Sequence, residues 1–411
     1  MFNFNYRIWY FDLTNYLYLL KGINQSIQQS AQNTQLDNQI SEIPFFRLCK
    51  IIASNGGLSG KGIVHLAPWV IKTTLFEPLR WIESVRWTKK INLYEITQPP
   101  IFILGYYRSG TTYLQRMFMQ DPSFGYTSIF QTVLPEIMLS FEKSFTPLLQ
   151  MVSRTFRLKN HFHRIPLTWK NFPGEEDVAL TAMLQPGASQ WGSLFPRSFN
   201  EYLEKYVLIR DVSPVTFENW KKNYLFLLSK ISIANNDKQL VLKNPPNTAR
   251  IKMLLSLFPR AKFIHIIRDP FEVFSSNRRF WEVLKKNYML GPAEFINTDA
   301  LILDSYAAIM QQYQEQKKYI PAGQLAEISY ENFIDQPIQT LSDLYTKLDL
   351  GNFEICKPAM TDLVQQQKKY DRLQHKLDEG SKDLILQKWD PYIKLWKGLC
   401  NDPLYSRSNT R

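Results

Sequence analysis

A loop near residue 105 combines the residue types that bind phosphate groups. Gly105 and Gly110 bracket a cation, Arg108. Hydroxyl side chains accompany them at Ser109, Thr111 and Thr112. The backbone N–H groups of a glycine turn and the positive end of a following helix attract an anion, and an arginine guanidinium fits an oxyanion. These residues therefore predict a phosphate-binding loop.

The residues on either side indicate how the loop is positioned. The apolar run at 101–104 predicts a buried strand, and residues 111–119 predict a helix. The glycine spacing equals that of the nucleoside-triphosphate P-loop, G-x-x-x-x-G-K-[ST], but Thr111 occupies the lysine position and the cation lies three residues earlier. We therefore expect a phosphate-bearing nucleotide, but not a triphosphate held in the usual way.

A second candidate site follows the apolar run at 262–268. Arg268 ends this predicted strand, and Ser276 lies eight residues later, within a helix that Pro270 can begin. Ligands of open α/β sheets bind beyond the carboxyl ends of the strands, so Arg268 and Ser276 are placed to hold a second phosphate. The alternative is a salt bridge between Arg268 and a nearby carboxylate.

Together these two segments resemble the paired nucleotide-binding signatures of the sulfotransferases that use 3′-phosphoadenosine-5′-phosphosulfate (PAPS). In that family the first motif, P-[KR]-S-G-T-T, holds the 5′-phosphosulfate, and an Arg and a Ser eight residues apart hold the 3′-phosphate. The resemblance covers roughly residues 98–350 and is closer to the branch with Arg in the first motif, which includes bacterial and protein-tyrosine sulfotransferases. It implies PAPS as co-substrate, 3′-phosphoadenosine-5′-phosphate (PAP) as product, no metal, and a donor site of Arg108, Ser109, Gly110, Thr111, Thr112, Arg268 and Ser276.

The chain departs from the family pattern at three places. Tyr107 stands where the family usually has Pro. Where the family has a Lys followed four residues later by His, this chain has Lys243 and Asn247, and an amide cannot act as a general base at neutral pH. The glycine-rich C-terminal nucleotide motif of the cytosolic enzymes is absent, which leaves Ser329 and Tyr330 as candidates for the adenine end.

An acidic segment at 172–180 supplies the candidate base. It resembles the P-x-E-D-E segment of the bacterial branch, which implies that Glu175, or next Glu176, takes the proton of the acceptor hydroxyl. The alternative is an acidic first turn that stabilises a helix dipole. Arg108 and Lys243 are then expected to stabilise charge on the leaving phosphate and the equatorial oxygens.

The resemblance implies in-line transfer of a sulfuryl group from PAPS to a hydroxyl of a carbohydrate, lipid or other small molecule. One alternative is a P-loop nucleotide kinase or NTPase, which Thr111 disfavours. Another is a non-catalytic nucleotide-binding protein on the same fold, which Asn247 leaves open. An aromatic acceptor pocket is a hypothesis that rests on Tyr106, Trp169, Trp191 and Phe195.

The order of elements predicts an α/β fold with a P-loop-like central parallel sheet and helices on both faces. The predicted strands are 101–104, 240–243, 262–268 and 326–330. The predicted helices between them are 111–119, 248–258, 304–318 and 338–348. We expect residues 98–400 to form this domain and residues 1–97 to form a mostly helical N-terminal extension.

Within that extension, residues 68–91 have apolar residues at helical spacing and several Trp, Lys and Arg, with a break expected at Pro78. Such a helix can lie on an anionic membrane, pack on the domain core, or contact a second subunit of a homodimer. Packing on protein is the favoured interpretation.

The net charge of +12 indicates an anionic partner, but the Lys and Arg residues are scattered, which disfavours nucleic acid. Three distant cysteines, no signal peptide pattern and no run of about 18 apolar residues predict a cytoplasmic protein, with peripheral membrane contact as the alternative. His161 and His163 form an H-x-H pair without a third ligand at readable spacing, and His265 is expected in the core.

Overall fold

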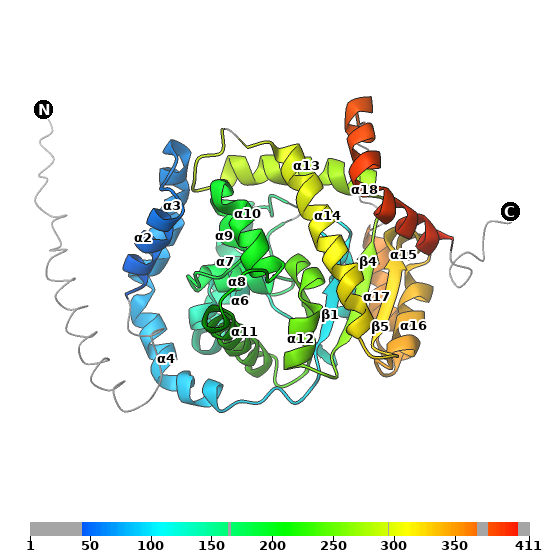
Figure 1. Cartoon of the computed structure of the whole chain (residues 1–411). Coiled ribbons are helices and arrows are strands. Elements are labelled where there is room, and N and C mark those ends of the chain that lie inside the picture. The colour runs from blue at the N-terminus through cyan, green and yellow to red at the C-terminus, as the bar shows by residue number, and fades with distance from the viewer. Residues whose placement is uncertain (1–42, 163–165, 295, 368–376, 402–411) are drawn as a thin grey trace, which may run out of the picture.

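The computed structural model describes residues 43–162, 166–294, 296–367 and 377–401 (Figure 1). In these residues a five-stranded, wholly parallel sheet has the strand order β2-β3-β1-β4-β5. The strands are β1 (Ile101–Leu104), β2 (Phe124–Gly125), β3 (Gln239–Lys243), β4 (Lys262–Ile267) and β5 (Leu325–Ser329). The four predicted strands are confirmed, and β2, with two residues, is too short to leave a pattern in the sequence.

Helices make up most of the rest of the described chain. They are α2 (Pro44–Ser54), α3 (Gly60–Leu75), α4 (Glu77–Asn92), α5 (Thr111–Phe118), α6 (Ile129–Val133), α7 (Met138–Thr155), α8 (Glu176–Ala182), α9 (Gln190–Leu194), α10 (Phe199–Tyr202), α11 (Pro214–Ala234), α12 (Ile251–Leu257), α13 (Pro270–Asn287), α14 (Thr298–Gln316), α15 (Tyr330–Asp335), α16 (Pro337–Leu348), α17 (Phe353–Gln367) and α18 (Glu379–Cys400). Among the described residues, no helix has the length and apolar character that a membrane crossing requires.

The sheet separates two apolar cores, as predicted for a parallel sheet covered on both faces. Alternate residues of β1 point to opposite sides: Phe102 and Leu104 enter one core, and Ile101 and Ile103 enter the other. The first core is completed by α8 and by α11 to α14, and the second by α5, α15, α16 and α17 (Figure 1). The predicted P-loop-like α/β architecture is therefore confirmed.

Helix boundaries differ from the sequence prediction where a cap overrides the apolar pattern. Helix α14 begins at Thr298, six residues before the predicted start, because the Asn297 side chain accepts a hydrogen bond of 3.0 Å from the Ala300 N–H. Helix α3 begins at Gly60 with Ser59 as its cap, so Pro68 lies inside it rather than at its start. The predicted break falls at Phe76, two residues before Pro78.

The N-terminal helices are joined to the rest of the domain by buried ion pairs. Glu83 on α4 and Lys230 on α11 are 2.8 Å apart and only 2% and 3% exposed. The Glu83 carboxylate also accepts hydrogen bonds of 3.0 and 2.8 Å from the backbone N–H groups of Leu139 and Ser140, at the start of α7. One carboxylate therefore links three helices.

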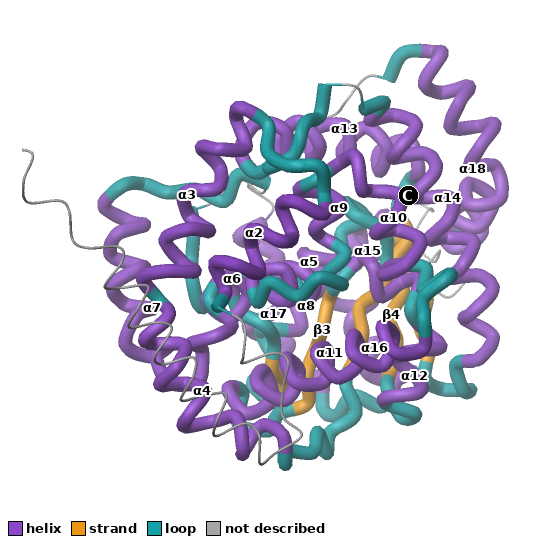
Figure 2. Tube along the Cα trace, turned by 60° about the vertical axis from the view of Figure 1, so that its left-hand side comes forward, coloured by secondary structure: helices purple, strands orange, loops and turns teal. Residues whose placement is uncertain are grey.

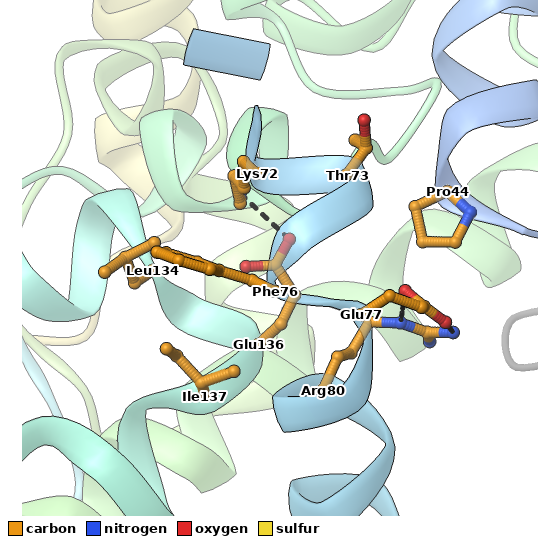
Figure 3. Close-up of a pocket in the computed structure, with 9 residues that line it drawn as sticks. All are labelled: Pro44, Lys72, Thr73, Phe76, Glu77, Arg80, Leu134, Glu136 and Ile137. Carbon is orange, nitrogen blue, oxygen red and sulfur yellow. Dashed lines mark hydrogen bonds and ion pairs between the residues drawn. The ribbon is translucent and has the colours of Figure 1, made fainter. Parts of the chain in front are cut away.

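A second ion pair lies at the turn between α3 and α4. Lys72 is 2.9 Å from Glu136, and the two side chains face each other across a small pocket that Phe76 also lines (Figure 3). Lys72 also donates a hydrogen bond to the carbonyl oxygen of Ala182, at the end of α8. These contacts fix α3 and α4 against the helices of the sheet domain.

We expect residues 44–97 and the sheet domain to unfold as one unit. Replacing Glu83 with Gln leaves the buried Lys230 ammonium without a counter-charge, so the substitution should cost about 3–5 kcal/mol of unfolding free energy in a single transition. Urea denaturation followed by circular dichroism measures this loss. Glu201→Gln is the control, because Glu201 pairs with Lys205 at the surface and should contribute about 0–1 kcal/mol. A separate early transition of the N-terminal helices would contradict the expectation.

Candidate active site

The carboxyl ends of the strands gather the candidate residues at one edge of the sheet. Because β1 pairs in parallel with both β3 and β4, the loop that follows β1 lies between the ends of its two neighbours. Lys243 ends β3, Arg268 follows β4, and Tyr330 follows β5. Open α/β sheets bind ligands at this edge, so the fold brings together segments that lie more than 200 residues apart in the sequence.

The loop after β1 requires glycine at both ends. Gly105 donates its backbone N–H to the Thr248 hydroxyl at 2.8 Å, and a Cβ there would lie 2.7 Å from the Ile266 carbonyl oxygen. Gly110 has a φ of +96°, and a Cβ there would lie 2.3 Å from the Tyr330 ring. A side chain at either position would displace the loop, which is why the glycine spacing is diagnostic of this turn.

The hydroxyl side chains of the loop have different environments. Ser109 is buried and donates a 2.7 Å hydrogen bond to the Tyr106 carbonyl oxygen, so its hydroxyl closes the turn. Thr111 is buried in the first turn of α5, and Thr112 beside it is partly exposed. Of the three predicted hydroxyls, Thr112 is thus the most accessible to a ligand.

Arg108, Ser276 and Arg268 lie in one cluster. The Arg108 side chain donates from Nε to the Ser276 hydroxyl at 3.0 Å, and Arg268 donates from Nη1 to the Arg108 carbonyl oxygen at 3.3 Å. The Arg268 guanidinium also lies 4.7 Å from the centre of the Tyr330 ring. The two predicted motifs therefore meet, and both include an arginine suited to a phosphate.

The salt-bridge alternative for Arg268 is also present. Its Nη2 lies 3.3 Å from Oε2 of Glu272, one turn into α13. Helix α13 begins directly after Arg268 because Pro270 occupies its first turn and the Asp269 side chain accepts a 2.8 Å hydrogen bond from Phe271 N–H. This cap sets the helix phase that brings Ser276 back towards the loop.

Glu175 and Lys243, predicted as base and cation, are direct partners. The Lys243 ammonium contacts Oε1 of Glu175, and the side chains are 3% and 25% exposed. Glu175 is the residue before α8, whose first turn contains Glu176 and Asp177. Helix α8 therefore has the acidic first turn that the alternative interpretation describes. In addition, the Glu175 carboxylate, just before this turn, reaches Lys243 at the end of β3.

Glu176 is fully buried, whereas the preceding Glu175 is a quarter exposed. Burial, opposed by the Lys243 charge and reinforced by the charges of Asp177 and Glu175, raises the pKa of Glu176 to about 8. Its Oε1 has no hydrogen-bond partner, and its Oε2 lies 3.5 Å from the amide nitrogen of Asn247. A carboxylic acid that is neutral near pH 7 fits this environment.

Asp177 belongs to a network that sequence reasoning missed. Burial alone would raise its pKa, but the Arg250 guanidinium lowers it below the ordinary value through two hydrogen bonds of 2.8 and 2.9 Å. Asn244 donates to the same carboxylate at 2.8 Å. Asp177 and Arg250 are 73 residues apart, so no local spacing reveals the pair, which anchors α8 to the segment after β3.

The predicted aromatic pocket is wrong in part. Trp191 and Phe195 are fully buried in the core, and Tyr106 is 3% exposed with its hydroxyl 2.8 Å from that of Ser305. Trp169 is partly buried and donates from Nε1 to the Ser153 hydroxyl. The large apolar side chains near residue 191 fill the centre of the domain instead of lining a site.

A different aromatic cluster lies beside the loop. Ring centres are 5.8 Å apart for Tyr107 and Phe280, 5.0 Å for Phe280 and Phe162, and 5.4 Å for Phe162 and Tyr288. Burial, with a smaller contribution from the charges of Glu175 and Asp177, raises the pKa of Tyr107 well above its ordinary value. We call these four residues the aromatic wall.

The histidines have ordinary environments. His161 Nδ1 lies 2.8 Å from the Tyr288 hydroxyl, whereas His163 lies outside the described residues. His265 is buried in β4, as expected, and stacks on Tyr313 with ring centres 3.9 Å apart. Burial lowers the pKa of His265, although Glu327 lies 3.7 Å away. Across the described part of the chain, no group of three or more His, Cys, Asp and Glu residues is arranged to hold a metal.

Comparison with known proteins gives a family match over most of the sheet domain. A sequence model described as "Sulfotransferase family" matches residues 99–354. Two relatives, from Mycobacterium bovis and Mycobacterium tuberculosis, are both named omega-hydroxy-beta-dihydromenaquinone-9 sulfotransferase Stf3. Each is 27% identical over 298 residues, which are 72% of this chain and 75% of the relative.

Solved structures resemble the whole described fold. Sulfotransferase STF9 from Mycobacterium avium has a TM-score of 0.65 with 16% identity, over 89% of this chain and 95% of its own. Sulfotransferase STF1 from Mycobacterium tuberculosis H37Rv has a TM-score of 0.60 with 16% identity, over 90% of this chain and 98% of its own. At this identity the likeness concerns the fold alone.

The raised pKa of Glu176 predicts a pH-dependent stability. Between its ordinary pKa of 4.5 and its folded pKa of about 8, the folded protein holds a proton that the unfolded chain has lost, so stability falls as pH rises through this range. Glu176→Gln removes this contribution. Relative to the parent protein, the variant should therefore gain on the order of a few kcal/mol between about pH 5 and about pH 8.5. Thermal unfolding at both pH values measures the difference, and an equal offset at both would contradict the assignment.

Proposed function

We propose the donor, the acceptor class and the residue roles from one premise: the chain belongs to the sulfotransferase family. Its activity is the transfer of a sulfuryl group, and we infer PAPS as the donor and a hydroxyl as the acceptor. The observation that carries the donor assignment is the cluster of Arg108, Ser276, Arg268 and Tyr330, because it joins the two segments that resemble the PAPS signatures.

The residues present fit a nucleotide with two anionic ends. The loop from Gly105 to Thr112, with its glycine cradle and Arg108, suits the 5′-phosphosulfate. Arg268 and Ser276 suit the 3′-phosphate. Tyr330 lies against Gly110 and over Arg268, so its ring is placed to contact the adenosine. PAPS would supply the activated sulfuryl group at this site.

We assign the base to Glu175 rather than Glu176. Glu175 is a quarter exposed and paired with Lys243, whereas Glu176 is fully buried and neutral near pH 7. In the reaction, a bond forms between the acceptor oxygen and sulfur, the bond between sulfur and the 5′-phosphate oxygen breaks, and PAP leaves. The hydroxyl proton moves to Glu175.

Lys243 has two successive roles in this proposal. Before transfer it holds the Glu175 carboxylate in place through their ion pair. When Glu175 takes the proton, the attraction between the two side chains falls, and the Lys243 ammonium can stabilise the charge that develops on the leaving phosphate. Arg108, within the glycine loop, stabilises the equatorial oxygens of the sulfuryl group during transfer.

The class of acceptor follows from the relatives and the aromatic wall. The Stf3 proteins are named for omega-hydroxy-beta-dihydromenaquinone-9, and the wall beside the loop offers four aromatic rings. We therefore propose that the acceptor is a hydroxyl on an apolar molecule such as a hydroxylated lipid, with Tyr107 packing against its apolar part.

Donor binding is tested by thermal shift with PAP, ADP and Mg-ATP. We expect PAP at about 100 times its Kd to add roughly 2.7 kcal/mol of stability. Ser276→Ala removes one hydrogen bond to a charged group, worth about 1.5–3 kcal/mol, and should weaken PAP at least about tenfold. Ser275→Ala, one residue away on α13, is the control and should leave PAP affinity unchanged. Stabilisation by Mg-ATP but not by PAP would favour the kinase alternative.

The base is tested by PAP release from PAPS with a panel of sugars, phenols, alcohols and hydroxylated lipids. Glu175→Gln should lower turnover about 10²–10⁴-fold because a general base contributes that much. Glu176→Gln is the matched control: the amide resembles the neutral acid already present, so turnover should fall less than about tenfold. The reverse ranking would move the base to Glu176, and PAP binding without transfer to any acceptor would favour the non-catalytic alternative.

A further inference from the structure

The solvent side of the N-terminal helices is apolar. Along α3 and α4 the exposed apolar side chains recur at helical spacing, so they share one side of the helix pair. They are Ile63, Val64, Ile71, Leu75, Trp81 and Val85, between 47% and 73% exposed. The opposite side packs on the domain, where the rings of Trp69 and Trp191 lie against each other at a tilt, with centres 5.3 Å apart. A helix buried on one side ordinarily has polar residues on the other, so this apolar stripe is unusual for a surface that faces water.

The end of α7 continues this surface. Its exposed apolar residues are Leu148, Met151, Val152, Phe156 and Leu158, between 37% and 71% exposed. Helix α7 contacts α4, and Figure 2 shows α3, α4 and α7 along the same edge of the molecule. We call the exposed residues of α3, α4 and 148–158 the outer face.

The exposed charges of the segments that carry the outer face are mostly positive. Nine basic side chains are exposed in the described segments 44–94 and 138–162: Lys50, Lys61, Arg86, Lys89, Lys90, Lys143, Arg154, Arg157 and Lys159. Within these segments no carboxylate is among the exposed residues, and the first exposed one, Glu95, follows directly after residue 94. Glu77 and Glu83 form ion pairs with Arg80 and Lys230, and Glu142 accepts hydrogen bonds from α6 and its cap. Apolar surface framed by positive charge complements an anionic lipid headgroup layer.

We propose that the outer face docks on an anionic membrane surface. Its apolar side chains enter the boundary between headgroups and acyl chains, and the surrounding Lys and Arg contact lipid phosphates. A second copy of the chain suits this face less well, because it would bring two positively charged surfaces together. Residues 1–42, which lie outside the described residues, hold two basic and three acidic side chains, so their sequence has fewer carboxylates than these segments have exposed cations.

The outer face adjoins the aromatic wall. At the start of α3, Ser59 N–H donates to the Leu290 carbonyl oxygen at 2.8 Å, and His65 Nδ1 lies 2.7 Å from the Met289 carbonyl oxygen. The neighbouring Tyr288 stacks on Phe162, a few residues beyond the end of α7. Docking would therefore hold the aromatic wall close to the lipid surface. That a lipid acceptor enters the site along this wall rests on the proposed function.

The test is cosedimentation of the full chain with vesicles of phosphatidylcholine, with and without phosphatidylglycerol, in the absence of any nucleotide. We expect binding to the anionic vesicles that weakens as salt rises. Val64→Glu/Val85→Glu should weaken it roughly tenfold or more, since each charge near the surface changes binding about fivefold. Val215→Glu/Ile355→Glu is the matched control, because these residues are equally exposed at 71% and 68% but belong to α11 and α17, which carry no residue of the outer face.

Three outcomes would overturn the proposal. They are no binding to anionic vesicles at low salt, equal binding by both double variants, and a dimer in light scattering that only Val64→Glu/Val85→Glu dissociates, which would assign the face to a second copy. Thermal unfolding of both variants checks that each is folded. Because the assay contains no PAPS, its failure is distinguishable from failure of the sulfuryl-transfer proposal, which the PAP and turnover measurements test.

Discussion

Parallel pairing of β1 with β3 on one side and β4 on the other is the constraint on which the site depends. The pairing puts the end of β1 between Lys243 and Arg268, so the glycine loop is flanked by a cation on each side. The next helices begin just beyond these strand ends, α5 after Gly110 and α13 after Asp269. The glycine loop, two arginines and a lysine thus converge because all the strands run the same way.

Three consecutive carboxylates at the start of α8 lie in different environments. Glu175 reaches the solvent-accessible edge and pairs with Lys243, Glu176 is held in the core with a pKa near 8, and Asp177 is locked by Arg250. Successive residues at the start of a helix point in different directions, so the side chains of three consecutive acidic residues lie in three different environments. The Asp177 pair anchors α8, at whose start Glu175 pairs with Lys243 at the end of β3 while Glu176 is buried.

The sequence predicts the parts of this arrangement that depend on local pattern. The strands and the loop follow from apolar runs and glycine turns, which act over a few residues, whereas the eight-residue spacing of Arg268 and Ser276 is recognised through the family resemblance. Contacts set by chain folding could not be predicted: Tyr330 on Gly110 joins segments 220 residues apart, and Arg250 finds Asp177 over 73. The aromatic residues failed for a related reason, because composition does not distinguish Trp191, which fills the core, from Tyr107, which lines the loop.

The N-terminal helices resolve an apparent choice between packing on protein and lying on a membrane. A helix has two sides, and here each is apolar for a different reason. The inner side is fixed by Trp69 and by the Glu83–Lys230 pair, which hold α3 and α4 rigidly on the domain. The exposed stripe from Ile63 to Val85 lies on the other side, where its side chains are 47–73% exposed and so bury little apolar surface. Its apolar character, framed by basic residues, is therefore best explained by a partner outside the chain.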